Sequence, residues 1–132
     1  DMQGRSYSVD CLHGDIRQSQ REKVMQKFRD GKLNVLVATD VASRGIDVDD
    51  VECVINYDIP EENEYYIHRI GRTGRARRKG AAYTLVGSLL EKSKLDEIAK
   101  YSHFTIKPVK LTGDGKLQEV EVKKPQVKLK YR

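Results

Sequence analysis

Short apolar segments alternate with amphipathic segments along this chain, and this alternation limits its fold more than any other feature. Residues 33–38 and 51–57 are continuous apolar runs, typical of strands that are buried on both faces of a parallel sheet. Residues 18–29 and 63–70 have the apolar spacing of helices. Strands that alternate with helices predict an α/β fold with a parallel sheet and right-handed crossovers.

Three further elements are predicted around these four. Residues 6–12 and 81–86 have the character of strands, and residues 88–101 that of an amphipathic helix. Ser88 and Glu91 are spaced as a capping box at the start of that helix. Near the end of the chain, residues 109–111 and 117–122 flank a glycine-containing turn, which predicts either an ordered hairpin or a basic arm that orders on RNA.

Polar residues follow the strand that ends at Ala38, where ligands gather in open parallel sheets. They open the first of two unusual runs, Thr39-Asp40-Val41-Ala42-Ser43-Arg44-Gly45-Ile46-Asp47. The second run follows about twenty residues later and is His68-Arg69-Ile70-Gly71-Arg72-Thr73-Gly74-Arg75. Guanidinium groups at this spacing suit a polyphosphate, and Arg72 and Arg75 would share one face if the segment starts helical. Taken alone, such a basic cluster would more often be a solvated face or a nonspecific nucleic-acid patch.

In this order and at this separation, the two runs resemble the DEAD-box RNA helicases, specifically the second of that family's two RecA-like domains. The resemblance covers residues 12–86 and includes His13-Gly14-Asp15 and Gln18-Ser19-Gln20-Arg21. It implies a RecA-like parallel sheet flanked by helices over residues 1–107, followed by a basic extension over residues 108–132. The family's second domain opens with a further strand and helix, which do not occur in this sequence. If they are also absent from the molecule, we expect an incomplete sheet and a fragment that can dimerise.

The resemblance also assigns residues to an ATP site. Arg72 and Arg75 correspond to arginine fingers that meet the terminal phosphates, and Gly45 and Asp47 to ATP-binding positions, with Asp47 on the ribose. An aspartate in the local sequence of Asp47 would otherwise be a turn residue. His68 and Arg69 correspond to positions that couple the nucleotide site to the partner domain and the RNA; His68 has the alternative of a hydrogen bond within the interface.

RNA contacts are implied at six positions and are directed at the backbone, because an unwinding enzyme cannot depend on base sequence. These positions are Gly14, Asp15, Gln18, Arg21, Thr39 and Arg44. Gln18 and Arg21 would otherwise form an ordinary exposed helix turn, and Arg44 has the alternative of an ion pair within the domain. The basic residues 77–79 either extend the basic surface or form a solvated turn, and the solvated turn is favoured.

Neither a GxxxxGK[ST] phosphate loop nor an Asp-Glu-Ala-Asp run occurs in this sequence. In the family these belong to the first RecA-like domain, which holds Mg²⁺. We therefore expect ATP with Mg²⁺ as cofactor, RNA and the N-terminal RecA-like domain of the same protein as partners, and no ATP hydrolysis by this chain alone. The alternatives are a docking module for RNA or a regulatory protein and, with less support, a DNA translocase.

Composition adds three expectations. The 132 residues suit one core, and the net charge of +5 is unevenly distributed: residues 108–132 carry seven basic and three acidic residues. Cys11 and Cys53 lie in apolar segments and are predicted to be buried free thiols. No apolar stretch is long enough to span a membrane and no signal peptide opens the chain, so a cytoplasmic location is expected.

Overall fold

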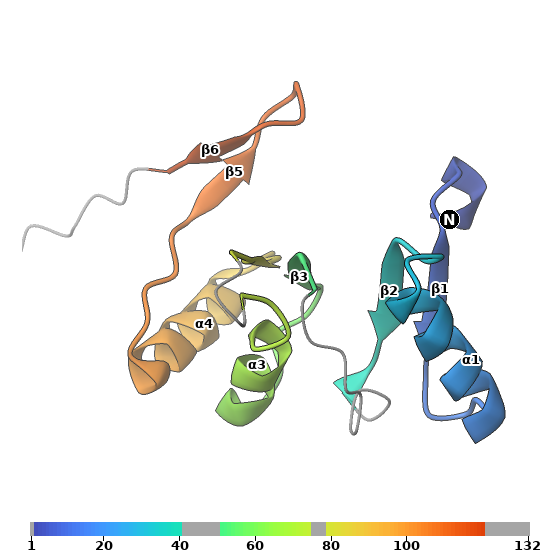
Figure 1. The fold of residues 1–132 in the computed structure, drawn as a ribbon. Coiled ribbons are helices and arrows are strands. Elements are labelled where there is room, and N and C mark those ends of the chain that lie inside the picture. The colour runs from blue at the N-terminus through green and yellow to red at the C-terminus, as the bar shows by residue number, and fades with distance from the viewer. Residues whose placement is uncertain (1, 41–50, 75–78, 121–132) are drawn as a thin grey trace, which may run out of the picture. The chain divides into compact units, whose positions relative to one another are not determined.

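The computed structural model describes residues 2–40, 51–74 and 79–120, and the chain divides into two compact units, Asp1–Leu85 and Val86–Arg132. In the first unit, a short 3₁₀ turn at Gln3–Arg5 precedes β1 (Val9–Leu12), α1 (Gln18–Arg29) and β2 (Val35–Ala38) (Figure 1). The sequence-based boundary after residue 107, which separates a domain from a basic extension, stays a prediction.

α1 crosses between two parallel strands that pair in register from Val9 with Val35 to Leu12 with Ala38. The helix ends where the sequence predicts, because Gly31 adopts a positive φ of 73° that glycine takes at little cost. Leu12 and Met25 are buried at the centre of the core between β1 and α1. Partly buried side chains pack around these two: Ile16, Val24, Phe28, Leu36 and Val51.

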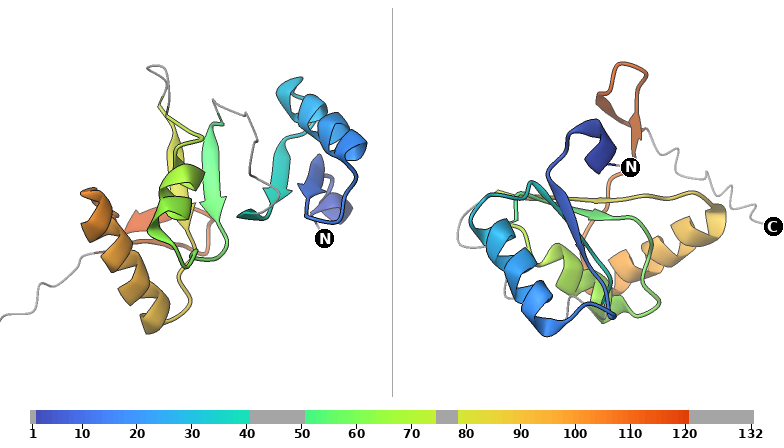
Figure 2. Two further views of the ribbon diagram at one scale, coloured as in Figure 1. Left: turned by 90° about the horizontal axis from the view of Figure 1, so that it is seen from below. Right: turned by 90° about the vertical axis from the view of Figure 1, so that its right-hand side faces the viewer.

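A second strand–helix–strand element follows in the same unit. β3 (Cys53–Asn56) and β4 (Ala81–Thr84) are parallel and are connected through α3 (Asn63–Ile70), which lies beside them in Figure 2. Asn56 is the register partner of Thr84, so the carboxyl ends of the two strands are level. This arrangement confirms the predicted α/β class with parallel strand pairing.

Two details of the predicted sheet are wrong for the described residues. The four parallel strands form two separate pairs, β1–β2 and β3–β4, rather than one continuous ladder. The strands are also not buried on both faces, since Val37 is 50% and Ile55 is 66% exposed. The reason is visible in the first pair, where Leu36 packs on the core beneath α1 while its neighbour Val37 points to the other face.

The cysteine prediction fails for the same reason. Cys11 and Cys53 are free thiols, as expected, but both are exposed rather than buried. Cys11 precedes the fully buried Leu12 in β1, so the alternation of side chains along the strand places the thiol on the opposite face. An apolar sequence context indicates a strand without indicating that both of its faces are covered.

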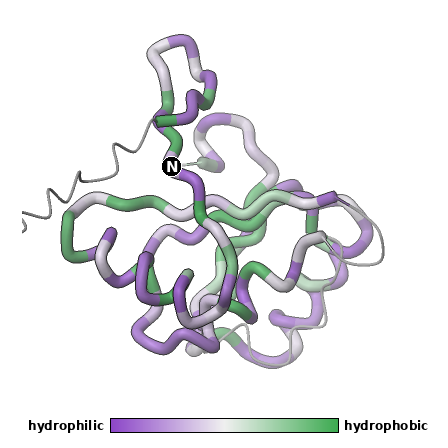
Figure 3. The backbone as a smooth tube through the Cα atoms, turned by 90° about the vertical axis from the view of Figure 1, so that its left-hand side faces the viewer, coloured by the Kyte–Doolittle hydropathy of each residue, from purple (hydrophilic) through white to green (hydrophobic). Residues whose placement is uncertain are grey.

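The second unit contains α4 (Leu89–Ser102) and a hairpin of β5 (Val109–Leu111) and β6 (Leu117–Glu119). The predicted cap is confirmed: the Ser88 hydroxyl accepts from the Glu91 amide at 3.2 Å, while the Glu91 carboxylate accepts from the Gly87 amide at 3.0 Å. Hydrophobic and hydrophilic residues alternate along the hairpin (Figure 3), whose antiparallel pairing confirms the ordered-hairpin alternative for residues 109–119. Among the described residues, no helix is long and apolar enough to cross a membrane.

Candidate functional site

Arg69 connects the carboxyl end of β2 with the carboxyl end of β3. Its guanidinium donates a hydrogen bond to each oxygen of the Asp40 carboxylate, from Nε at 2.8 Å and from Nη2 at 2.7 Å. The remaining nitrogen, Nη1, donates to the Asp58 carbonyl at 2.9 Å and to its carboxylate at 3.1 Å. This fork geometry is specific to arginine, because a lysine presents one point charge instead of a planar array of donors.

The Arg69–Asp40 pair is partly shielded from water, which strengthens it. The side chains are 20% and 31% exposed, respectively. The hydrogen bonds from Arg69 lower the pKa of the Asp40 carboxyl against an opposing effect of burial, and Asp40 in turn raises the pKa of Arg69. Both groups are therefore charged at neutral pH. The pair fixes α3 to the segment that follows β2.

A second group of contacts lies beside this pair and includes two almost fully buried side chains. Asn56 is 2% exposed and Tyr66 is 3% exposed. The Thr84 hydroxyl accepts from Asn56 Nδ2 at 3.3 Å and shares a hydrogen bond with the Tyr66 hydroxyl at 2.9 Å. Asn56 Oδ1 in turn accepts from Arg69 Nη1 at 3.4 Å. The contacts join residues on β3, β4 and α3 into one polar chain, which we call the Thr84 network: Tyr66, Thr84, Asn56, Arg69 and Asp40.

Arg72 lies in a turn immediately after α3. The helix ends at Ile70. The condition under which Arg72 would share a helical face with Arg75, a helix that includes Arg72, is therefore not met. The Arg72 carbonyl accepts from the Val51 amide at 3.1 Å, and its Nε donates to the His68 carbonyl at 3.4 Å. The turn is thereby attached both to α3 and to Val51, two residues before β3. The side chain of His68 is exposed.

Gly80 packs against the same turn more closely than any other residue type would allow. A Cβ added at this position would lie 1.9 Å from Thr73 Oγ1 and 2.5 Å from the backbone nitrogen of Gly74. Backbone atoms cannot yield to a methyl group as a flexible side chain does. The residue before β4 therefore sets the position of the turn that contains Arg72.

We expect Gly80→Ala to displace this turn and to destabilise the protein by about 2 kcal/mol, the usual range for overpacking. Thermal unfolding and hydrogen exchange over residues 71–74 measure the effect. Gly113→Ala is the matched control, because a Cβ at Gly113 meets nothing within 4 Å. Equal stability of the two variants would show that the close approach at Gly80 relaxes without cost.

Several residues assigned to RNA binding come together at the ends of β1 and β2. Thr39 directly follows β2, and its amide donates to the Leu12 carbonyl at the end of β1 at 3.3 Å. The exposed residues Gly14 and Asp15 follow β1 and lead to α1, whose first residue is Gln18. The structure thus brings the segments around residues 13–15 and 39–40 to one edge.

Four of the predicted site residues, Arg44, Gly45, Asp47 and Arg75, lie outside the described residues. Arg21 is half-buried on α1, and its contribution to an RNA surface stays a prediction. The alternative of an ion pair within the domain for Arg44 therefore stays a prediction, while Arg69 forms such a pair with Asp40. The proposed coupling role of Arg69 stays a prediction beside these internal contacts.

Sequence reasoning missed Asn56, Asp58, Tyr66 and Thr84. A usable signal existed for two of them, because Asn56 and Asp58 are polar residues at the end of an apolar run and so mark the carboxyl end of a parallel strand. Tyr66 and Thr84 gave no such signal. A tyrosine within a helix and a threonine at the end of a strand are ordinary packing residues until their hydroxyl groups are seen to meet.

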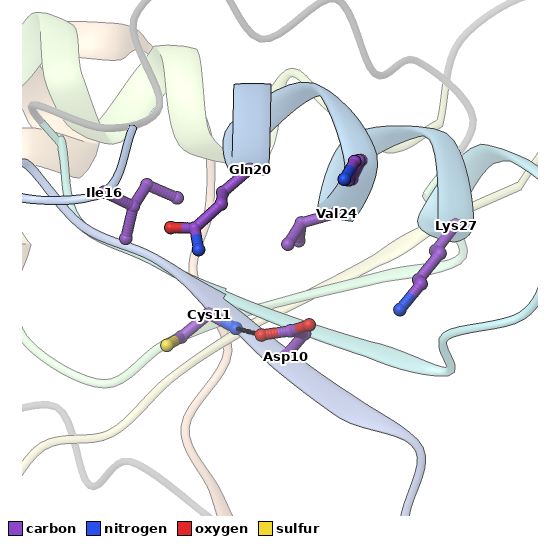
Figure 4. A pocket seen from close by; sticks show the side chains of 7 residues that line it. Asp10, Cys11, Ile16, Gln20, Val24 and Lys27 are labelled. Atoms are coloured by element: carbon purple, nitrogen blue, oxygen red, sulfur yellow. Dashed lines mark hydrogen bonds between the residues drawn. The ribbon is translucent and has the colours of Figure 1, made fainter. Parts of the chain in front are cut away.

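A pocket of about 310 Å³ lies between β1 and α1, away from these contacts (Figure 4). Its lining combines lysines with one carboxylate, and the Asp10 carboxylate accepts from the Cys11 amide at 2.8 Å. The lining residues are Asp10, Cys11, Ile16, Gln20, Lys23, Val24 and Lys27. None of the site residues predicted from the sequence lines this pocket.

Comparisons with known proteins identify the family to which these features belong. The helicase conserved C-terminal domain matches residues 2–77. The chain is 50% identical over 103 residues to the ATP-dependent RNA helicase FAL1 of Kluyveromyces lactis, covering 78% of this chain and 26% of that protein. It thus spans about a quarter of the length of this curated relative.

Solved structures agree with the sequence comparison. A DEAD box protein from the hyperthermophile Methanococcus jannaschii superposes with a TM-score of 0.71 at 46% identity, covering 79% of this chain and 28% of that one. The E. coli DEAD-box protein SrmB, in a structure bound to regulator of ribonuclease activity A, gives a TM-score of 0.69 at 41% identity, covering 76% and 58%. The chain therefore belongs to the helicase conserved C-terminal domain family, as the second RecA-like domain of a DEAD-box RNA helicase.

Proposed function

We propose that this chain supplies one half of a composite ATP site, and part of the RNA-binding surface, in an ATP-dependent RNA helicase. The observation that carries the proposal is the placement of Arg72. This arginine follows α3 in a turn that is hydrogen-bonded to Val51, two residues before β3, and α3 itself is fixed to the end of β2 through Arg69 and Asp40. Because the backbone at Arg72 is fixed in this way, its guanidinium would be positioned to bind a phosphate of a nucleotide held by another domain.

The chemistry of phosphoryl transfer explains why arginine suits this position. The transferred group spreads negative charge over its equatorial oxygens, so catalysis depends on positioning and charge stabilisation. Arg72, together with Arg75, would donate charge-assisted hydrogen bonds to the terminal phosphates of ATP. Gly45 and Asp47 would contact the rest of the nucleotide, with Asp47 accepting from a ribose hydroxyl.

Magnesium would be held by the first RecA-like domain. Within the described ranges, no group of three or more histidine, cysteine, aspartate or glutamate side chains is arranged to hold a metal ion. The bound ion would neutralise the charge that develops on the phosphates. The residues of this chain would orient the nucleotide and contribute guanidinium groups.

RNA would bind at the edge formed by the ends of β1 and β2. Thr39 has a hydroxyl there, Gly14 a backbone amide and Asp15 a carboxylate, and the amino end of α1 lies next in the chain. Backbone amides and hydroxyls recognise phosphates and 2′-hydroxyls without reading bases. Contacts of this kind suit an enzyme that acts on many sequences. Gln18, Arg21 and Arg44 would add to this surface.

ATP hydrolysis by this chain alone, and by the chain joined to the first RecA-like domain, tests the proposal. We expect no turnover by the chain alone and RNA-stimulated turnover by the joined protein. A joined protein that is folded and binds RNA but does not hydrolyse ATP would contradict the proposal.

The basic extension is proposed to add nonspecific affinity for RNA. Removing residues 109–132 should weaken RNA binding and reduce its salt dependence, because fewer phosphates would be neutralised and fewer counterions released. Binding titrations in the full-length protein at several salt concentrations measure both effects. An unchanged salt slope would exclude a role for the extension.

A second candidate function is a docking surface for a regulatory protein. The observation in its favour is that the related SrmB structure contains regulator of ribonuclease activity A. The arginines at 72 and 75 discriminate between the candidates, because a docking module needs no paired guanidiniums for phosphoryl transfer. Loss of ATP turnover on their substitution favours the enzyme.

A further inference from the structure

The Thr84 network holds α3 at two points on the same side of the helix. Tyr66 and Arg69 are three residues apart on α3, a spacing that places side chains on one face. Tyr66 meets the end of β4 through Thr84, and Arg69 meets the end of β3 through Asn56 and Asp58. Because Asn56 also donates to Thr84, the contacts form a closed loop from α3 through both strand ends and back.

We propose that Thr84 is a positioning residue for ATP hydrolysis, acting through Tyr66 and Asn56 on α3 and, through α3, on Arg72. The effect on ATP hydrolysis rests on the proposed function, whereas the positioning of α3 by Thr84 does not. Thr84 is 12 residues beyond Arg72 in the sequence, and its side-chain hydrogen bonds within the described ranges go to Asn56 and Tyr66, neither of which was assigned to ATP or RNA. Its hydroxyl forms hydrogen bonds with both Tyr66 and Asn56.

Backbone hydrogen bonds connect the turn that contains Arg72 directly to α3, the helix that Thr84 contacts through Tyr66. The Gly71 amide donates to the Ile67 carbonyl at 2.9 Å and the Arg72 amide to the Arg69 carbonyl at 3.3 Å, so the turn begins as a continuation of the helical backbone. A rotation of α3 about its axis would therefore move the start of the Arg72 side chain. Breaking the hydroxyl contact removes one of the two points that oppose this rotation.

The hydroxyl, rather than the bulk of Thr84, carries the role. Asn56 and Tyr66 are almost fully buried and Thr84 is half-buried, so removing the hydroxyl takes a hydrogen-bond partner from each of two largely shielded side chains. Thr84→Val keeps the shape of the side chain and deletes the hydroxyl, whereas Thr84→Ser keeps the hydroxyl and deletes a methyl group. Tyr66→Phe deletes the other end of the same hydrogen bond.

Steady-state ATP hydrolysis by the full-length protein with RNA tests the proposal. We expect Thr84→Val to lower kcat about tenfold while the KM for ATP stays within about twofold, because misplacement of a transition-state contact reduces kcat more than ground-state binding. Tyr66→Phe should lower kcat in the same way, and the double variant should be no worse than Thr84→Val. Thr84→Ser should retain most of the wild-type kcat. Thr105→Val, at an exposed threonine, is the matched control.

Three results would overturn the proposal: unchanged kcat in both Thr84→Val and Tyr66→Phe, an equal loss in Thr84→Ser and Thr84→Val, or an effect confined to KM. Hydrogen exchange separates this failure from failure of the proposed function. If the wild-type protein shows no RNA-stimulated hydrolysis, the proposed function fails. Faster exchange over residues 71–74 in Thr84→Val, with no change in β1, would still support the positioning step, and its absence would refute it.

Discussion

Replacing Arg72 by lysine in the full-length protein is expected to remove most RNA-stimulated ATP hydrolysis and to leave the fold intact. An arginine finger contributes about 10³ to 10⁵ in rate, and a lysine offers a single point charge in place of a planar pair of donors. Arg72 is half-buried in a turn whose backbone is fixed at the Val51 amide, so the substitution changes the side chain without loosening its anchor. The same loss is expected for Arg75→Lys.

Steady-state hydrolysis with saturating RNA measures this effect, and thermal unfolding checks that the fold is retained. Arg29→Lys is the matched control, because Arg29 is an exposed arginine in the last turn of α1. The helix starts near the carboxyl end of β1, so its last turn lies away from that edge. Turnover close to wild type in either Arg72→Lys or Arg75→Lys would refute the finger assignment. A parallel loss in Arg29→Lys would show that the assay reports general damage.

The helices could be predicted from the sequence because their signals are local. Residues 18–29 and 63–70 are helical over the predicted spans, and α4 begins one residue after its predicted cap. The strands are shorter than their apolar runs: β2 begins at Val35 rather than residue 33, and β3 ends at Asn56 rather than residue 57. Apolar character extends beyond the residues that form the ladder, so it overestimates strand length.

The contacts of the candidate site could not be predicted, because they join residues far apart in the chain. Arg69 and Asp40 are separated by 29 positions, and Asn56 and Thr84 by 28. Periodicity and capping rules describe neighbours within about one or two helical turns and contain no information about such pairs. The motifs placed Asp40 and Arg69 near a site, but only the positions of the strand ends show that the two side chains meet.

Asp40→Asn is expected to lower the free energy of unfolding of the domain by about 2 kcal/mol at neutral pH. This is less than the usual cost of removing one partner of a fully buried ion pair, because both side chains retain some contact with water. The amide keeps the shape of the carboxylate but removes its charge and leaves Arg69 with the more exposed Asp58 as its acidic partner. Asp58→Asn is the matched control. The Asp58 side chain is 78% exposed and its carbonyl still accepts from Arg69, so its loss should cost less than about 0.5 kcal/mol.

The pH dependence of this difference distinguishes the ion pair from simple packing. Arg69 lowers the pKa of Asp40 below its ordinary value, so the folded state binds fewer protons at this group than the unfolded state. The stabilisation is therefore fully present above the ordinary pKa of about 4 and is lost as the pH falls through the lower pKa of the folded protein. Hydrogen exchange of α3 amides in the full-length protein, measured across this range with correction for the intrinsic pH effect, should show wild type and Asp40→Asn converging at acid pH. A difference that stays constant down to pH values below about 3 would mean that the cost of Asp40→Asn comes from the exchange of an acceptor oxygen for an amide NH2 group opposite Arg69, and not from the loss of the charge.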